Sequence, residues 1–350
     1  MTTPSHALRT DGGGSLGFGH VNRCLIIADA IRARGGTPEL VLGVASAEVL
    51  SHVRNAGYAC RQLDPAARFD AGQVLLDAHS AVFDFSHRET RAHLANAQDM
   101  LRASRAAGAR TMLIDAKGEE CLSALSAMET DILAIPYAGA ESEQVLPGAK
   151  VDVRGLQYFA LAHEYLDDKH TARDTPEIAT KILVTAGGSD PVGLTEFFLD
   201  VLDPIHDPLE IRIVIGPGFR SSQAKTIASR AERMPHNTEL VNAPENLADE
   251  IFRADLALSA SGLTKYELAF AGTPSVLLSI DENHDIANRP FAALGSCVDA
   301  GRFDAANPVA VRDLVATLIR DPVHRRIMAT AGPAAIDGRG TQRLLDLLDG

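Results

Sequence analysis

Short apolar runs bounded by Gly, Asp or Pro alternate with helical stretches along this chain, and the alternation occurs twice. Such alternation is typical of βαβ units, in which helices join and cover parallel strands. In the first half, the runs that predict strands are residues 39–44, 81–85, 111–114 and 132–135. In the second half they are residues 181–185, 210–215, 256–259 and 275–280, separated by predicted helices at 194–202, 222–233, 263–271 and 285–294. The pattern predicts two α/β domains, each built on a parallel sheet.

The length of the chain supports the same division. At 350 residues it exceeds what one hydrophobic core usually organises. The segment 167–177 (DDKHTARDTPE) is polar, contains Pro176 and has few apolar residues, as exposed linkers do. We therefore predict a first domain at 1–166, a linker at 167–177, a second domain at 178–335 and a C-terminal segment at 336–350.

Charge and composition exclude several classes of partner. The formal net charge is −13 and no run of Lys and Arg opposes it, so the chain would repel a nucleic-acid backbone and disfavour anionic lipid. No stretch approaches the roughly 18 apolar residues of a spanning helix, and the first residues lack the apolar core of a signal peptide. The cysteines lie far apart without metal-binding spacing. We expect a cytoplasmic protein without stable membrane insertion, with reduced cysteines (Cys24, Cys60, Cys121 and Cys297) and an oligomeric state that the sequence leaves open.

A glycine-dense loop at 11–20 (DGGGSLGFGH) runs directly into a helix whose apolar stripe is Cys24, Ile27, Ala28 and Ile31. The loop is not a Walker motif, because no GK[ST] follows, and it is not a GxGxxG fingerprint, because Asn22 stands where the last glycine would be. His20 lies at the junction of loop and helix, where Ser, Thr, Asp or Asn would cap better. His20 is therefore a candidate catalytic group, with a structural histidine as the alternative.

Three more loops follow predicted strands, where ligands collect in open α/β sheets. The loop at 259–264 opens a helix, and its amides and hydroxyls suit a diphosphate; Glu267, one turn further on, suits the ribose hydroxyls. The loop at 185–191 is a candidate for the same ligand, with a plain turn capped by Asp190 as the alternative. Asp84, Asp115 and the turn at 281–284 also follow strands, although single residues there are more often turn or cap residues.

Taken in order, these segments resemble the family of the pseudaminic-acid-pathway UDP-sugar hydrolase and the related spore-coat polysaccharide proteins. The resemblance spans about residues 9–295, and it rests on residues 11–35 (DGGGSLGFGHVNRCLIIADAIRARG), 82–85 (VFDF), 113–116 (LIDA), 155–167 (GLQYFALAHEYLD), 185–195 (TAGGSDPVGLT) and 254–289. That family belongs to the GT-B superfold, in which two Rossmann-like parallel-sheet domains face each other across a cleft. The peptidoglycan glycosyltransferase MurG is a more distant relative. By the same analogy, residues 340–348 form a helix that packs back on the first domain.

The resemblance implies roles for individual residues. His20 matches the histidine that activates water in the hydrolase, and Arg23 completes the same element. A nucleotide-diphosphate sugar is the expected ligand, with no cofactor and no metal, and a common interdomain gap is expected to join His20 and Glu267. The implied nucleotide-sugar-binding residues are Gly17, Gly19, Gly187, Gly188, Asp190, Ser261, Gly262, Leu263, Thr264, Glu267, Asn283 and His284, and the candidate sugar contacts are Asp11, Arg23 and Asp84.

Two positions depart from the family pattern, which has Asp-Asp where this chain has Asp115-Ala116 and Gln where it has His284. The leading hypothesis is hydrolysis of a UDP-linked amino or deoxy sugar, with His20 as general base, water attacking the anomeric carbon and inversion expected. A glycosyltransferase that uses the same donor with a soluble acceptor is the first alternative. A sugar-nucleotide-binding protein without turnover is the second.

Overall fold

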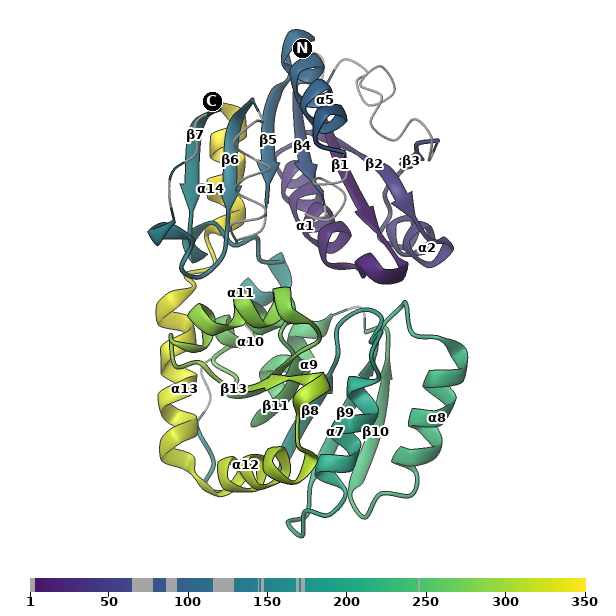
Figure 1. Ribbon diagram of the computed structural model, residues 1–350, viewed down its shortest axis with the longest axis vertical. Helices are drawn as coiled ribbons and strands as arrows, with labels where there is room; N and C mark the ends of the chain where they lie inside the picture. The colour runs from purple at the N-terminus through teal and green to yellow at the C-terminus, as the bar shows by residue number, and fades with distance from the viewer. Residues whose placement is uncertain are drawn as a thin grey trace. The chain divides into compact units, whose positions relative to one another are not determined.

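The computed structural model describes residues 4–64, 78–85, 93–115, 129–143, 145, 148–167, 170, 174–244 and 246–350. The chain forms two compact units (Figure 1). One comprises Met1–Ala162 together with Gly338–Gly350, and the other comprises His163–Asp337. Within the predicted linker, residues 168–169 and 171–173 lie outside the described residues, as do Ala116 and Cys121.

The first unit is built on a parallel sheet with the strand order β3-β2-β1-β4-β5-β6-β7 in its described part. The bounds are β1 (Ser5–Gly12), β2 (Thr37–Ala45), β3 (Cys60–Gln62), β4 (Ser80–Asp84), β5 (Arg110–Ile114), β6 (Thr130–Ile135) and β7 (Ala149–Arg154). The four strands predicted from the first half of the sequence are confirmed as β2, β4, β5 and β6. The order reverses between β1 and β4, where Thr10 is paired with Asp84. This reversal is the place where a doubly wound sheet leaves room for a ligand.

The helices of the first unit are α1 (Gly19–Ala33), α2 (Ala47–Asn55), α5 (Leu94–Ala106) and α14 (Gly340–Asp349), with short 3-10 turns η1 (Gly14–Leu16), η2 (Ala140–Ser142) and η3 (Leu156–Tyr158). The predicted stripe of α1 is confirmed, since Cys24, Ile27, Ala28 and Ile31 are all buried. The C-terminal helix α14 packs against α1 and buries Leu344, Leu345 and Leu348 in the same core. The ion pairs of Arg34 with Asp346 and Asp349 also join these helices.

The second unit has a parallel sheet with the strand order β10-β9-β8-β11-β12-β13. The bounds are β8 (Lys181–Thr185), β9 (Glu210–Ile215), β10 (Asn237–Asn242), β11 (Leu256–Ala260), β12 (Ser275–Ser279) and β13 (Cys297–Arg302). The helices are α7 (Leu194–Leu202), α8 (Ser221–Ala231), α9 (Leu247–Arg253), α10 (Thr264–Phe270), α11 (Glu282–Ala292), α12 (Pro308–Arg320) and α13 (Pro322–Ala335), with 3-10 turns η4 (His163–Leu166) and η5 (Phe303–Ala305). The four strands and four helices predicted for this half are confirmed, with bounds that differ by at most three residues at either end.

Two helical layers cover the second sheet. The order reverses between β8 and β11, and parallel crossovers are right-handed, so α7 and α8 cover one face while α10 and α11 cover the other. Contacts of α7 with α8 and of α9 with α10 agree with this arrangement. The loops after β8 and β11 therefore meet at the reversal, where both predicted nucleotide loops lie.

Candidate active site

Tight glycine turns bring His20 and Arg23 to the start of α1. The backbone reverses after β1, where the amide of Gly13 donates to the carbonyl of Gly17 over 2.7 Å. Gly13 has φ +90, and a Cβ there would lie 2.5 Å from Oγ of Ser46, so no larger residue fits without a shift. Gly17 also has a positive φ, and Gly19 is the first residue of α1. The chain therefore enters α1 with His20 on its first turn and Arg23 at the start of the next turn.

The carboxylate of Asp84, at the end of β4, binds both of these side chains. Its Oδ1 lies 2.7 Å from Nδ1 of His20, and Arg23 donates to both carboxylate oxygens over 2.7 Å. Arg23 also donates to the hydroxyl of Tyr137. Asp84 is fully buried and Arg23 is 2% exposed, whereas the His20 side chain is 22% exposed. The network therefore buries Asp84 and Arg23 and leaves His20 and Tyr137 partly exposed.

The charges in this network stabilise one another. Burial alone would raise the pKa of Asp84, but the cation of Arg23 and the His20 contact outweigh it and hold that pKa below its ordinary value. Burial likewise opposes the charge of Arg23, but Asp84 raises the pKa of this guanidinium well above its ordinary value. Asp84 is therefore an ionised carboxylate that can only accept hydrogen bonds.

This geometry assigns the tautomer of His20. A carboxylate oxygen at 2.7 Å requires a proton on Nδ1, because an unprotonated nitrogen would repel it. Arg23, a pure donor, stands further from the same nitrogen, at 3.4 Å. The lone pair of neutral His20 therefore lies on Nε2, for which no partner is found in the described residues. An imidazole oriented by a buried carboxylate in this way is suited to accept a proton from a ligand hydroxyl.

Asp11 takes a structural position, and its burial argues against the predicted sugar contact. Its side chain is 1% exposed and forms a 2.8 Å ion pair with Arg9, which is fully buried. The same oxygen accepts a 2.8 Å hydrogen bond from the amide of Val44 on β2. Asp11 thus joins two strands inside the unit and has no exposed surface to offer a sugar.

In the second unit, the loop between β11 and α10 brings the predicted nucleotide residues together. Ser261 is buried, and its hydroxyl lies 2.9 Å from that of Ser279 at the end of β12. Gly262 has open space where a Cβ would be, and Leu263 and Thr264 are partly exposed at the start of α10. The Ser261 hydroxyl therefore fixes the loop, while Gly262 leaves its backbone open to a ligand.

Glu267, also on α10, is found with no cationic partner among the residues that the structure describes. Desolvation raises its pKa to about 7, although the Tyr165 and Thr264 side chains stabilise the ionised form, and Glu164 adds to the rise. Tyr165 comes from η4 and is 4% exposed, and burial followed by the nearby Glu267 raises its pKa well above the ordinary value. A half-desolvated carboxylate of this kind gains from hydroxyl donors supplied by a ligand.

The loop at 185–191 departs from its predicted role at Asp190. This residue is 1% exposed, and its two carboxylate oxygens accept hydrogen bonds from the amides of Leu194 and Thr195 at 2.7 and 2.9 Å. Its carboxylate thus caps α7, as the alternative interpretation has it, and is not available to a nucleotide sugar. Gly187 has φ +76 and open space beside its Cα, and the carbonyl of Gly188 accepts from Gly218 over 2.8 Å.

The turn at 281–284 is exposed and self-contained. Asp281 caps α11 by accepting from the amide of His284 over 2.9 Å, and its carboxylate also lies 2.7 Å from Nδ1 of that ring. These contacts lower the pKa of Asp281 to about 2. Asn283 is exposed beside them on the first turn of α11. The turn leaves Asn283 and the outer edge of His284 accessible.

The predicted residues thus form two groups, one in each unit. His20, Arg23 and Asp84 are brought together at the end of β4, and Ser261, Gly262, Leu263, Thr264 and Glu267 are brought together at α10. The expectation that His20 and Glu267 share one gap stays a prediction. Tyr137 and Tyr165 were not among the predicted site residues, although Tyr165 lies in the segment 155–167 that contributes to the family resemblance.

In the described part of the chain, no three His, Cys, Asp or Glu side chains gather in a way that could hold a metal ion. Within the same residues, no helix has the length and apolar character to cross a membrane.

Comparisons with known proteins support the architecture. No protein-family model matches the chain. A curated relative, the spore coat polysaccharide biosynthesis protein SpsG of Bacillus subtilis (strain 168), is 25% identical over 167 residues. That match covers 48% of this chain and 49% of SpsG, so the chain matches only about half of the relative's length.

Solved structures match over nearly the whole chain. MurG of Acinetobacter baumannii is 16% identical with a TM-score of 0.69, and 99% of each chain is covered. A putative UDP-N-acetylglucosamine 2-epimerase from Listeria monocytogenes is 14% identical with a TM-score of 0.63, covering 99% of this chain and 95% of that one. The chain has the GT-B fold, with two Rossmann-like parallel-sheet domains. The predicted fold class is confirmed.

Proposed function

We propose that the chain is a sugar-nucleotide-dependent glycosyltransferase, in which His20 removes a proton from an acceptor hydroxyl as that oxygen attacks the anomeric carbon of a UDP-sugar. The glycosidic C–O bond to the diphosphate breaks as the new C–O bond forms, and UDP leaves with the bonding electron pair. A single displacement of this kind inverts the anomeric centre.

The observation that supports this proposal most directly is the contact between His20 and Asp84. The buried carboxylate holds Nδ1 at 2.7 Å and so fixes the lone pair on Nε2. It also stabilises the imidazolium that forms when His20 accepts a proton, because Asp84 stays ionised. General-base catalysis by such a histidine contributes about 10²–10⁴ in rate.

The second unit supplies groups suited to the nucleotide. Glu267 can accept hydrogen bonds from both ribose hydroxyls, and those donors would relieve the desolvation that raises its pKa to about 7. The open backbone at Gly262 permits close approach of a diphosphate. The name of the Listeria relative in fold, a UDP-N-acetylglucosamine 2-epimerase, supports UDP as the nucleotide.

We favour transfer over hydrolysis, although hydrolysis is the leading hypothesis from the sequence. SpsG is named for polysaccharide biosynthesis, and building a polysaccharide requires sugars to be joined to acceptors. The fold is also that of MurG, the glycosyltransferase that the sequence resembles at a distance. Hydrolysis remains the second candidate, because the exposed edge of His20 would activate water as readily as a sugar hydroxyl.

UDP release from a panel of UDP-sugars, measured with and without candidate acceptors, tests the proposal. We expect slow release in buffer alone and release accelerated at least about tenfold by one class of soluble hydroxyl acceptor. Chromatography of the products should show the sugar joined to that acceptor, with the anomeric configuration inverted. Full-rate release of free sugar without any acceptor would reject transfer and establish hydrolysis, and binding without release would reject both reactions.

A further inference from the structure

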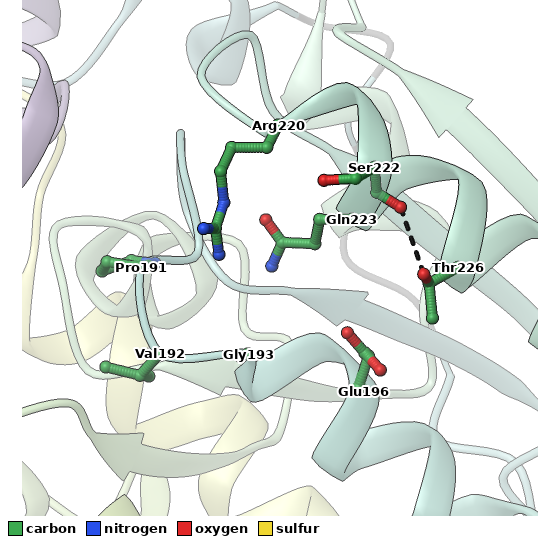
Figure 2. A pocket seen from close by; sticks show the side chains of 8 residues that line it. All are labelled: Pro191, Val192, Gly193, Glu196, Arg220, Ser222, Gln223 and Thr226. Carbon is green, nitrogen blue, oxygen red and sulfur yellow. Dashed lines mark hydrogen bonds between the residues drawn. The ribbon is translucent and has the colours of Figure 1, made fainter.

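A polar groove lies between α7 and α8 of the second unit, beside the end of the loop 185–191 (Figure 2). Its volume is about 350 Å³, within the range of small-ligand sites. It is lined by the loop 191–193 together with Glu196, Arg220, Ser222, Gln223 and Thr226. The helices α7 and α8 cover the sheet face opposite α10, and neither Glu267 nor any residue of the loop 259–264 lines the groove.

The two helices that form the groove begin differently. The first amides of α7 are bound by the carboxylate of Asp190, and Glu196 adds a further negative charge in the first turn. In contrast, α8 begins after Arg220, and no capping hydrogen bond from a side chain is found there in the described residues. The positive N-terminal end of α8 therefore lies beside the cation of Arg220, and no acidic residue of its first turn neutralises it.

Three side chains of the groove have charged or hydrogen-bonding groups that a ligand could use. Neither the guanidinium of Arg220 nor the carboxylate of Glu196 has a side-chain partner among the residues that the structure describes. Gln223 is 7% exposed, and its Nε2 donates to the carbonyl of Asp190 over 3.1 Å. Since that carbonyl can only accept, the amide cannot be flipped, and its Oε1 is left without a partner in the same described residues.

We propose that this groove binds a hydroxylated anion, namely a sugar phosphate or a sugar acid. The anionic group would lie against Arg220 and the free amides of α8, with the hydroxyl of Ser222 as a further donor. The hydroxyls of the same ligand would donate to Oε1 of Gln223 and to the carboxylate of Glu196. Figure 2 shows Arg220, Ser222 and Gln223 on one side of the groove and Glu196 on the other.

This combination of groups favours a hydroxylated anion over simpler ligands. A bare anion would gain from Arg220 and the helix end but would be repelled by Glu196. A neutral sugar would satisfy Glu196 and Gln223 but would leave the positive end of α8 without its counter-charge. A ligand with both kinds of group fits both halves of the groove. The proposal does not depend on the glycosyltransferase activity.

Isothermal titration calorimetry of the full chain tests this with glucose 6-phosphate, glucuronate, glucose and inorganic phosphate. We expect glucose 6-phosphate or glucuronate to bind at least about tenfold more tightly than both glucose and phosphate. The tighter of the two identifies the anion as phosphate or carboxylate. Equal affinity for inorganic phosphate would mean an adventitious ion only and would overturn the proposal.

Matched variants locate the binding. Arg220→Met should weaken it about tenfold or more, whereas Lys225→Met, which removes an exposed charge from the same helix outside the groove, should leave it unchanged. Glu196→Gln should strengthen binding of inorganic phosphate, because it removes a repulsion. Equal effects of the Arg220 and Lys225 substitutions, or displacement of the ligand by UDP, would overturn a separate site.

Discussion

Asp84 and Glu267 are both desolvated carboxylates at the reversal of a parallel sheet, yet their environments shift their pKa values in opposite directions. Asp84 is bound by Arg23 and His20, and its pKa is lowered. Glu267 has neighbouring hydroxyls but, in the described part of the chain, no cationic partner, and its pKa is raised to about 7. The first group is completed by the protein itself. The second is incomplete without a ligand.

This difference separates two tasks. A group that must orient a base has to hold one geometry before any ligand arrives, and a buried ion pair does so. A group that must bind and release a nucleotide does not need all its hydrogen-bond donors from the protein. When the ligand supplies the missing donors, it relieves the desolvation cost of the carboxylate, and this adds to the binding affinity. The comparison predicts opposite effects on the free energy of unfolding when each carboxylate is replaced by its amide. The Asp84 substitution should lower it, and the Glu267 substitution should raise it near neutral pH.

The largest effect is expected from Asp84→Asn. Removing this charge leaves the buried guanidinium of Arg23 without its counter-ion, which should cost about 3–5 kcal/mol of unfolding free energy. It should also lower turnover by about 10²–10⁴, because His20 loses the carboxylate that orients it. Urea denaturation and UDP release measure the two effects.

Asp11→Asn is the matched control for this variant. Asp11 is equally buried and also paired with an arginine, but it contacts no candidate catalytic residue. It should therefore lower the unfolding free energy by a similar amount and leave the turnover of the folded fraction unchanged. If both variants reduce turnover equally, Asp84 acts only through stability.

The next effect is expected from His20→Ala. Turnover should fall by about 10²–10⁴ while the unfolding free energy changes by less than about 1 kcal/mol, because the ring is partly exposed and Asp84 keeps Arg23. Affinity for UDP should not change. His79→Ala, which removes an exposed histidine of the same unit, is the control. Turnover that survives in His20→Ala would remove this residue from the mechanism.

Local apolar patterning was sufficient to predict most of the fold. The segments 181–185 and 194–202 are continuous or periodic in apolar residues, and they match β8 and α7 residue for residue. The edge strands β3, β7, β10 and β13 were not predicted, because strands at a sheet edge tolerate polar residues and lose the apolar run.

The central strand β1 was missed for a different reason. Seven of the eight residues of β1 (SHALRTDG) are buried. Four of these buried residues are polar, namely His6, Arg9, Thr10 and Asp11. Some of their partners lie within the strand, as in the ion pair of Arg9 with Asp11, and others lie on a neighbouring strand, as in the 2.8 Å contact of His6 with Ser80 on β4. An apolar pattern does not reveal such a strand, because the pairing of its buried polar side chains depends on the folded structure.

The same limit applies to the candidate site. His20 was predicted from its motif, and Asp84 was singled out from its position after a strand. Their direct contact spans 64 residues of sequence, and that of Arg23 with Tyr137 spans 114. The sequence therefore indicated the chemistry of single residues, while the pairing that fixes a tautomer required the structure.

Glu267→Gln should have a smaller effect, with the opposite sign for stability. The folded pKa of Glu267 lies above its unfolded value, so its stabilising contribution is complete below about pH 4.5 and is lost as the pH rises through about 7. Without ligand, the variant should therefore become more stable than the parent protein as the pH rises from 5 to 8. Glu232→Gln, at an exposed position, should show no such trend.

Affinity for a UDP-sugar checks the same residue from the ligand side. The ionised carboxylate is the better acceptor for ribose hydroxyls, so affinity of the parent protein should rise with pH up to about 8, and the variant should be roughly tenfold weaker at pH 8. A UDP-sugar is preferred to UDP here because its bridged diphosphate does not titrate near neutral pH. A pH-independent difference between the two proteins would contradict the assigned role.

The smallest effect is expected from Tyr137→Phe, which tests how complete the Asp84 network is. The substitution removes the hydroxyl that accepts from Arg23 and leaves that buried N–H with less hydrogen bonding, at a cost of about 1 kcal/mol. Asp84 keeps its three contacts, so turnover should change less than about threefold. Tyr158→Phe in the same unit is the control, since no hydrogen bond of its hydroxyl is found in the described residues. A loss of turnover as large as that of Asp84→Asn would show that Tyr137 belongs to the catalytic network, and that Asp84 and Arg23 alone do not hold His20.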